Sequence, residues 1–297
     1  MQTRTVMLAE GIRKSVLEHL TRLPPPLLPI RPGRSLISLW AEKTSSFVHE
    51  EKPFEVLVSS LEGYQSLVEL EGQPGFSRAI DPRPHRGTGG ALRDHIHQSG
   101  AGAEEMDYIV AIDRGACPPQ SLENFFHTLS KKKPDVLVGV SDYDRLAGIM
   151  AIRPSVLQLI PEVGYCDFKE QTLNKLASVG GSILALAIIP KSIRIGSLSG
   201  WIEAVSYHQI NGEDSHRERR HIERGSCCID DSADIGNAVV LDSIVMPDTV
   251  IGDRAVIARS AICPGSIVAP GARIIDSIVS DRVISINSRQ EYSGRLP

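Results

Sequence analysis

The chain has 297 residues, of which 41% are hydrophobic and 23% charged, and 32 Lys and Arg against 36 Asp and Glu give a formal charge of −4. This is the composition of a globular protein of one large or two smaller domains, and the mild negative charge excludes the basic field that sequence-independent nucleic-acid binding needs. The N-terminus is polar, and no apolar run approaches the roughly 20 residues that a membrane span requires, so we expect no membrane association. The five cysteines include no C-x-x-C pair, which favours reduced thiols in a cytoplasmic protein over disulfides.

Up to about residue 212, short apolar runs alternate with amphipathic stretches. The apolar runs have the length of buried strands and lie at 5–9, 54–58, 108–112 and 136–140. Apolar residues at helical spacing predict helices within 34–48, 63–70 and 120–133. This alternation predicts an α/β domain over residues 1–212, built on a mostly parallel sheet that binds ligands beyond the carboxyl ends of its strands.

Three features of this domain are candidates for chemistry. The loop Glu10–Ser15 follows the first strand and leads to a proline-rich segment over 24–30. Arg86–Arg93 is a glycine-rich turn entering a helix, whose backbone N–H groups suit a phosphate or the close approach of a flat base. Asp113 closes a strand, where a carboxylate can hold Mg²⁺ against phosphate oxygens. Each feature also has an ordinary explanation as a turn or helix cap.

The chain from residue 213 onward has a different sequence pattern. Residues 213–225 are rich in balanced charges and are predicted to be a linker. In the region 226–297, Ser243, Ser260 and Ser277 recur every 17 residues, and aliphatic residues recur about every six positions. Such a pattern is typical of short strands joined by tight turns, which stack into a β-solenoid with aliphatic side chains along its axis.

In this order, the segments resemble the sugar-1-phosphate nucleotidyltransferases, and among them the members with a C-terminal left-handed β-helix. Leu8-Ala-Glu-Gly11 and Pro24–Ile30 fall into the frame of the family's L-A-G-G and P-K-P-L-L-P-[IV] motifs. Gly87–Leu92 is similar to G-T-A-G-A-L, and Asp113 stands at the family's metal-binding aspartate. Asp167–Leu176 is similar to D-F-E-x-D-x-L-P-x-L.

The resemblance implies a Rossmann-like, mostly parallel sheet domain followed by a left-handed β-helix of hexapeptide repeats. It also implies that the chain binds a nucleotide or nucleotide sugar, with Asp113 as the ligand of Mg²⁺. The residues implied for nucleotide binding are Leu8, Ala9, Gly11, Gly87, Thr88, Gly89 and Gly90.

Several departures from the family's pattern bear on catalysis. Glu10 replaces a glycine of the first loop, Pro25 replaces a lysine, and Arg194 stands where the family has a second metal-binding aspartate. The short segment 142–146 also lacks the family's sugar-phosphate insertion. Because the reaction depends on positioning and on neutralising phosphate charge, we expect a non-catalytic or weakly active homologue, which regulates or senses sugar-nucleotide metabolism.

Two other functions are compatible with the residues. One is an active transferase that makes a nucleotide sugar and pyrophosphate, with Arg13 and Lys14 supplying the missing charge. The other is a structural assembly protein. An acyltransferase is disfavoured, since no histidine follows His221 to act as a general base in the solenoid. The solenoid is instead expected to mediate a homo-oligomer, or a hetero-oligomer with a catalytic homologue.

Overall fold

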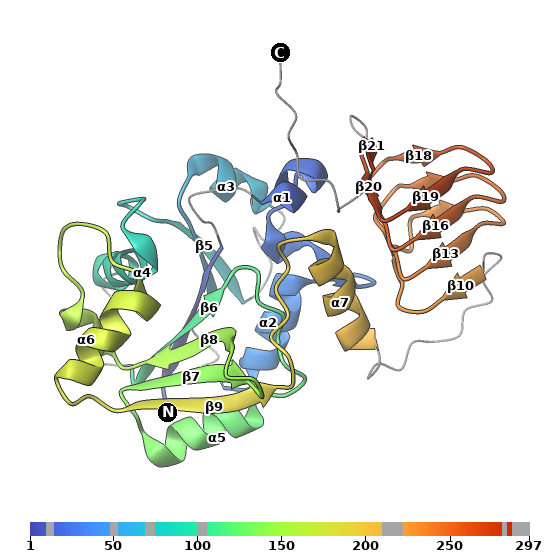
Figure 1. Cartoon of the computed structure of the whole chain (residues 1–297). Helices are drawn as coiled ribbons and strands as arrows, with labels where there is room; N and C mark the ends of the chain where they lie inside the picture. Colours follow the sequence, from blue (N-terminus) through green and yellow to red (C-terminus); the bar gives the residue numbers. More distant parts are fainter. Residues whose placement is uncertain are drawn as a thin grey trace. The chain divides into compact units, whose positions relative to one another are not determined.

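The structure, a computed structural model, is drawn in Figure 1. It describes residues 1–9, 15–47, 53–68, 75–99, 106–209, 222–280 and 284–286. These residues form two compact units, the first from 1–9, 24–27 and the described residues of 37–193, and the second from 15–23, 28–36 and the described residues from 194 onward. The boundary predicted at residue 212, and most of the predicted linker, lie outside the described residues. No helix in the described part of the chain combines the length and the apolar character that crossing a membrane requires.

A seven-stranded sheet forms the centre of the first unit. Its strands are β1 (Thr3–Leu8), β4 (Phe54–Val58), β5 (Phe76–Ile80), β6 (Tyr108–Asp113), β7 (Val136–Ser141), β8 (Leu146–Ile152) and β9 (Ile183–Ile189). They lie in the order β5-β4-β1-β6-β8-β7-β9. Every neighbouring pair is parallel except the two that involve β8. The prediction of a mixed α/β unit on a mostly parallel sheet is confirmed.

Helices cover this sheet because its inner strands carry mostly apolar residues on both faces. The helical elements of the first unit are η1 (Pro25–Leu27), α2 (Leu36–Ser45), α3 (Leu61–Ser66), α4 (Gly87–Gln98), α5 (Glu123–Lys132), η3 (Pro154–Leu159), η4 (Phe168–Thr172) and α6 (Leu173–Ser178). One buried cluster joins alternate residues of the strands, such as Val6 and Ile109, to Leu92 of α4, Phe168 of η4 and Leu176 of α6. These three helical elements therefore share one face of the sheet.

The second unit contains a short helical and hairpin part together with stacked strands. Its helices are α1 (Val16–Thr21) and α7 (Leu198–Gln209), and its hairpin strands are β2 (Pro29–Arg31) and β3 (Arg34–Ser35). Trp201 of α7 is fully buried and donates its indole N–H to the carbonyl of Pro29 at 2.8 Å. The side chain of Gln209, at the end of α7, donates to the carbonyl of Cys227.

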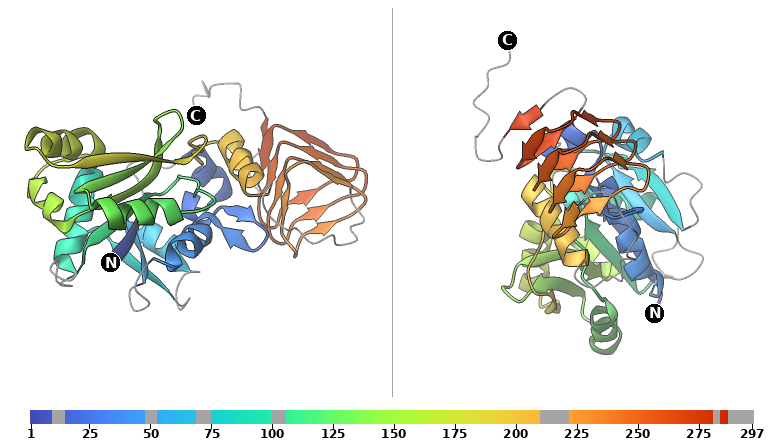
Figure 2. Two further views of the ribbon diagram at one scale, coloured as in Figure 1. Left: turned by 90° about the horizontal axis from the view of Figure 1, so that it is seen from below. Right: turned by 90° about the vertical axis from the view of Figure 1, so that its right-hand side faces the viewer.

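The remaining strands of this unit stack into three parallel sheets that resemble a β-helix (Figure 2). One sheet is β10 (Ile222–Arg224), β13 (Val239–Leu241), β16 (Val256–Ala258) and β19 (Arg273–Ile275). The second is β11 (Cys228–Ile229), β14 (Ile244–Val245), β17 (Ala261–Ile262), β20 (Ser277–Val279) and the antiparallel β21 (Ile284–Ile286). The third is β12 (Asp234–Ile235), β15 (Val250–Ile251) and β18 (Ile267–Val268). The left hand and the hexapeptide repeat stay predictions.

The 17-residue period matches a sharp corner of the backbone that recurs once in each coil, at a single residue with a positive φ angle. Asp242, Arg259 and Asp276 have positive φ angles of 43°, 45° and 49° and stand directly before the recurring serines. The aliphatic columns point inward, and residues such as Val240, Ile257 and Ile262 are fully buried in one continuous core. The repeated serines therefore mark the corners of successive coils, and the repeated aliphatic residues form the core.

Candidate functional site

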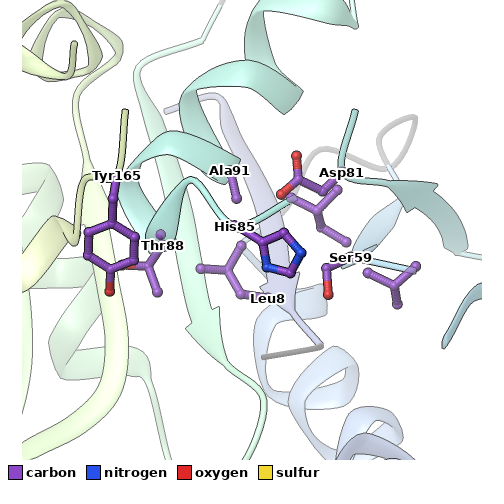
Figure 3. A pocket seen from close by; sticks show the side chains of 10 residues that line it. Leu8, Ser59, Asp81, His85, Thr88, Ala91 and Tyr165 are labelled. Carbon is purple, nitrogen blue, oxygen red and sulfur yellow. The ribbon is translucent and has the colours of Figure 1, made fainter. Parts of the chain in front are cut away.

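A cavity of about 210 Å³ opens where three neighbouring parallel strands end. Leu8 ends β1, Val58 ends β4 and is followed by Ser59, and Asp81 directly follows β5. The opposite wall comes from the start of α4 and from a nearby loop. The residues that line the cavity are Leu8, Leu57, Val58, Ser59, Asp81, His85, Gly87, Thr88, Ala91 and Tyr165 (Figure 3). This is the edge at which α/β sheets bind ligands.

The cavity has an apolar middle and polar ends. Asp81 and Ser59 lie at one end, and Thr88 and Tyr165 lie at the other (Figure 3). Aliphatic groups of Leu8 and Ala91 lie between them. A partly apolar molecule with polar groups at both ends fits such a space.

Asp81 is the buried carboxyl group of this cavity, with 5% of its surface exposed. Its Oδ1 accepts the backbone N–H of Arg83 at 3.0 Å. Burial raises the pKa of Asp81 above the usual range, and this hydrogen bond only partly opposes the effect. A carboxyl group held in this way is a strong acceptor for a ligand that brings N–H or O–H donors.

The glycine-rich turn has a packing function as well as a place in the cavity wall. The backbone N–H groups of Gly89 and Gly90 donate to the carbonyl of Cys166 at 3.0 and 3.3 Å. Gly87 has a φ of +77°, and a Cβ there would lie 2.6 Å from the same carbonyl oxygen. The first turn of α4 is thus fastened to residues 165–168, and Gly87 and Thr88 are the members of the turn that line the cavity.

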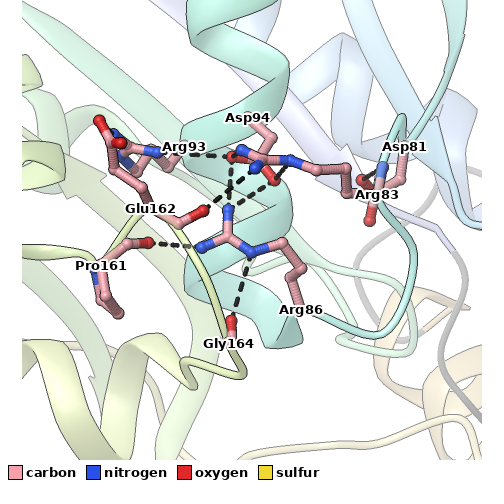
Figure 4. A network of polar contacts seen from close by, with 8 residues as sticks. All are labelled: Asp81, Arg83, Arg86, Arg93, Asp94, Pro161, Glu162 and Gly164. Carbon is pink, nitrogen blue, oxygen red and sulfur yellow. Dashed lines mark hydrogen bonds and ion pairs between the residues drawn. The ribbon is translucent and has the colours of Figure 1, made fainter.

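An ion network around the buried Asp94 fixes the loop that carries Tyr165 (Figure 4). The guanidinium of Arg86 donates to both carboxylate oxygens of Asp94 at 2.6 Å and also to the carbonyls of Gly164 and Pro161. Arg83 donates to Asp94 from its other side. Because Asp94 is only 2% exposed, its charge must be matched by these arginines. The network sets one wall of the cavity.

Asp113 lies beside the cavity, at the end of β6. In the sheet it is paired with Leu8, which lines the cavity. Its Oδ2 lies 3.5 Å from the Nζ of Lys169, and its Oδ1 accepts the N–H of Gly115. Lys169 belongs to η4, whose capping residue Asp167 accepts a hydrogen bond from Thr88 Oγ1 at 3.0 Å.

Among the described residues, the groups beside Asp113 do not fit a divalent metal ion. Mg²⁺ prefers several oxygen ligands and anionic charge, but an ammonium group lies next to this carboxylate. Within the described ranges, no three or more His, Cys, Asp or Glu side chains are placed to hold a metal ion together. Mg²⁺ at Asp113 stays a prediction that the donor set disfavours.

Only some of the predicted site residues line the cavity. Leu8, Gly87 and Thr88 line the cavity, whereas Gly89 and Gly90 are buried and do not line it, and Asp113 lies on the neighbouring strand. Ala9 is also buried and continues the pairing of β1 with β4. The predicted Gly11, Arg13 and Lys14 lie outside the described residues. Sequence reasoning missed Ser59, Asp81, His85, Tyr165 and Lys169.

Asp81 lies at the end of a strand as Asp113 does, but that strand has Ser77 and Arg78 in its middle and was not predicted, so the position of Asp81 gave no signal. The other missed residues come from separate segments and carry no local pattern. A comparison with known proteins matches no family model to this chain and no curated protein.

Proposed function

We propose that the chain binds a nucleotide or a nucleotide sugar in the cavity beside α4, as a non-catalytic or weakly active homologue of the sugar-1-phosphate nucleotidyltransferases. The observation that carries the proposal is the position of the cavity: it opens at the carboxyl ends of β1, β4 and β5, with Gly87 and Thr88 of the glycine-rich turn in its wall. Its apolar middle suits the face of a base, and Asp81 offers an acceptor for donor groups of a base or sugar.

The expectation of weak or absent catalysis rests on charge. Transfer of a nucleotidyl group needs the phosphate charges neutralised by cations that are already in place. The sequence has proline at position 25 and arginine at position 194 where the family has a lysine and a metal-binding aspartate. Asp113 is paired with Lys169. The proposed role is therefore to sense or regulate sugar-nucleotide metabolism.

Binding and turnover are tested separately. Thermal shifts with ADP-, GDP-, UDP- and dTDP-sugars test binding, with Ala91→Phe to fill the cavity and Ala177→Phe, on the exposed part of α6, as the matched control. We expect a shift that Ala91→Phe abolishes and Ala177→Phe keeps. If no nucleotide sugar shifts the protein, the binding proposal fails and an assembly function remains.

The catalytic alternative is tested by pyrophosphate release. Purified protein is incubated with Mg²⁺, nucleoside triphosphates and sugar 1-phosphates, with Asp113→Ala alongside. We expect no turnover, or turnover several factors of ten below that of an active enzyme, since one misplaced preorganised group costs about 10²-fold. Robust turnover that Asp113→Ala abolishes would make the chain an active transferase.

We propose further that the β-helix-like part mediates self-association. Val250 and Ile267 are partners in the register of β15 and β18, and they are 43% and 79% exposed. Adjacent exposed aliphatic side chains are typical of contact surfaces. Light scattering should give a mass above that of one chain, and Ile267→Glu should reduce it, while Arg273→Glu on another sheet should not. A monomeric wild-type protein would refute this proposal.

A further inference from the structure

Lys169 and Asp113 form an ion pair near the cavity, next to residues that line it. Their Nζ and Oδ2 atoms lie 3.5 Å apart, and their side chains are 27% and 26% exposed. The pair is connected to the cavity from two sides. Asp113 is the sheet partner of the lining residue Leu8, and Lys169 follows Asp167, which accepts a hydrogen bond from the lining residue Thr88.

The backbone holds Lys169 in this place. Asp167 Oδ1 accepts the N–H groups of Lys169 and Glu170 at 2.9 and 3.0 Å, which fixes the start of η4. The neighbouring Phe168 is 1% exposed, belongs to the core, and donates its N–H to Thr88 Oγ1 at 3.0 Å. The ammonium group is therefore carried by an anchored turn, beside the carboxylate and open to solvent.

The charge at this position is opposite to that of the motif that the segment resembles. Residues 167–169 read Asp-Phe-Lys, where the pattern D-F-E has a glutamate. A glutamate there would add a second carboxylate near Asp113, and two carboxylates attract a divalent cation. A lysine instead matches the charge of Asp113 and repels such a cation.

From this geometry we propose that Lys169 takes the place of a divalent cation beside Asp113 and binds the phosphate of the nucleotide in the cavity, so that binding needs no metal ion. This inference rests on the proposed function. An ammonium group binds phosphate oxygens as a compact point charge with three donors. Asp113 and Lys169 together carry no net charge, whereas Asp113 with a divalent cation would carry one positive charge. The pair therefore suits the diphosphate of a nucleotide sugar better than a triphosphate, which ordinarily brings its own Mg²⁺.

The pairing itself is tested without nucleotide, by titrating Mn²⁺ and recording its electron paramagnetic resonance. Wild-type protein should have no Mn²⁺ site that depends on Asp113, so Asp113→Asn should leave its Mn²⁺ binding unchanged. The same should hold for Lys175→Glu, a control on the exposed face of α6. Lys169→Glu should gain one Mn²⁺ site, and adding Asp113→Asn should abolish it. A wild-type Mn²⁺ site that depends on Asp113 overturns the inference, as does a folded Lys169→Glu protein that gains no site.

Phosphate binding is tested by calorimetry with ADP, GDP, UDP and dTDP, in EDTA and in Mg²⁺. The wild-type dissociation constant should agree within about twofold between the two buffers, and Lys169→Ala should weaken binding at least tenfold in EDTA. Wild-type binding that disappears in EDTA overturns the inference. If the diphosphates bind in neither buffer and the nucleotide sugars give no thermal shift, the proposed function is contradicted instead. The Mn²⁺ titration then tests the pairing of Lys169 with Asp113 by itself.

Discussion

The backbone N–H of Ser260 donates to the side-chain hydroxyl of Ser243, one coil earlier, at 3.1 Å. The same bond joins Ser277 to Ser260 at 3.1 Å, and each of these hydroxyls also donates to the carbonyl two residues before it. All three serines are at most 5% exposed. The hydroxyls thus satisfy backbone groups at a buried corner, where water is excluded.

Ser260→Ala should therefore destabilise the β-helix-like part. The substitution leaves the N–H of Ser277 buried without its acceptor, which costs about 1–3 kcal/mol. Ser232→Ala is the matched control, because its hydroxyl also accepts a backbone N–H from the next coil, that of Asp248, but is exposed. Urea unfolding followed by circular dichroism should show less than about 0.5 kcal/mol for the control. Equal losses would refute the burial argument.

The 17-residue period of the β-helix-like part could be predicted from the sequence, because the same residue type occupies the same structural position in each coil. Ser243, Ser260 and Ser277 mark the corner in every coil, and the aliphatic columns mark the core. In the first unit, the strands at 54–58, 108–112 and 136–140 were predicted from short, mostly apolar runs. β5 was not predicted, because it is an edge strand, partly exposed, with Ser77 and Arg78 in its middle.

The candidate site was only partly predictable for a different reason. Gly87 and Thr88 form a local pattern that a sequence displays directly. The role proposed for Lys169 depends on its contact with Asp113, which lies 56 residues earlier in the chain. Local propensity carries no information about that contact. It is fixed by the packing of Phe168 and by the cap on η4.

A second prediction concerns the buried ion pair between Arg4 and Glu55, residues that are 5% and 8% exposed. His95 also contacts the carboxylate of Glu55. Glu55→Gln should lower the free energy of unfolding by about 3–5 kcal/mol, because it leaves Arg4 buried without a countercharge. Glu162→Gln removes a pair with Arg93 in which Glu162 is 83% exposed, and it should cost less than about 1 kcal/mol. Urea denaturation measures both.

The same group makes stability depend on pH. Burial acts to raise the pKa of Glu55, but hydrogen bonds from His95 and Arg4 outweigh it and hold the pKa below the usual range. Its contribution is therefore complete above the ordinary glutamate pKa of about 4.3 and is lost as pH falls through the lowered folded value. The stability difference between wild type and Glu55→Gln should shrink below this pH. A difference that stays constant down to pH 3 would contradict the assignment.

A third prediction concerns the fastening of α4. Gly87→Ala meets two penalties, a φ of +77° and a Cβ that would lie 2.6 Å from the carbonyl oxygen of Cys166. Gly180→Ala meets only the first, since it has a φ of +80° with nothing within 4 Å of a Cβ. The control should lose about 1–2 kcal/mol, and Gly87→Ala should lose at least about 1 kcal/mol more. Equal losses in urea unfolding would show that the carbonyl moves aside at no cost.

The last prediction separates binding from stability at Asp81. Burial raises the pKa of this carboxyl group, with the N–H of Arg83 opposing the shift in part. The folded protein therefore holds the proton more tightly than the unfolded chain, and stability is lost as pH rises from about 3.9, the ordinary aspartate value, through the raised folded value. Asp81→Asn, which is neutral at every pH, should be more stable than wild type at pH 7, and its advantage should disappear near pH 3.

Asp81→Asn should at the same time weaken nucleotide-sugar binding at least tenfold, since a hydrogen bond to a charged acceptor contributes about 1.5–3 kcal/mol. Asp144→Asn, at an exposed turn between β7 and β8, should change neither quantity. Thermal denaturation across pH and calorimetry measure the two effects on the same protein. A variant less stable than wild type at pH 7 would mean that the carboxylate is a needed structural partner. Unchanged affinity would mean that ligands bind elsewhere on the sheet edge.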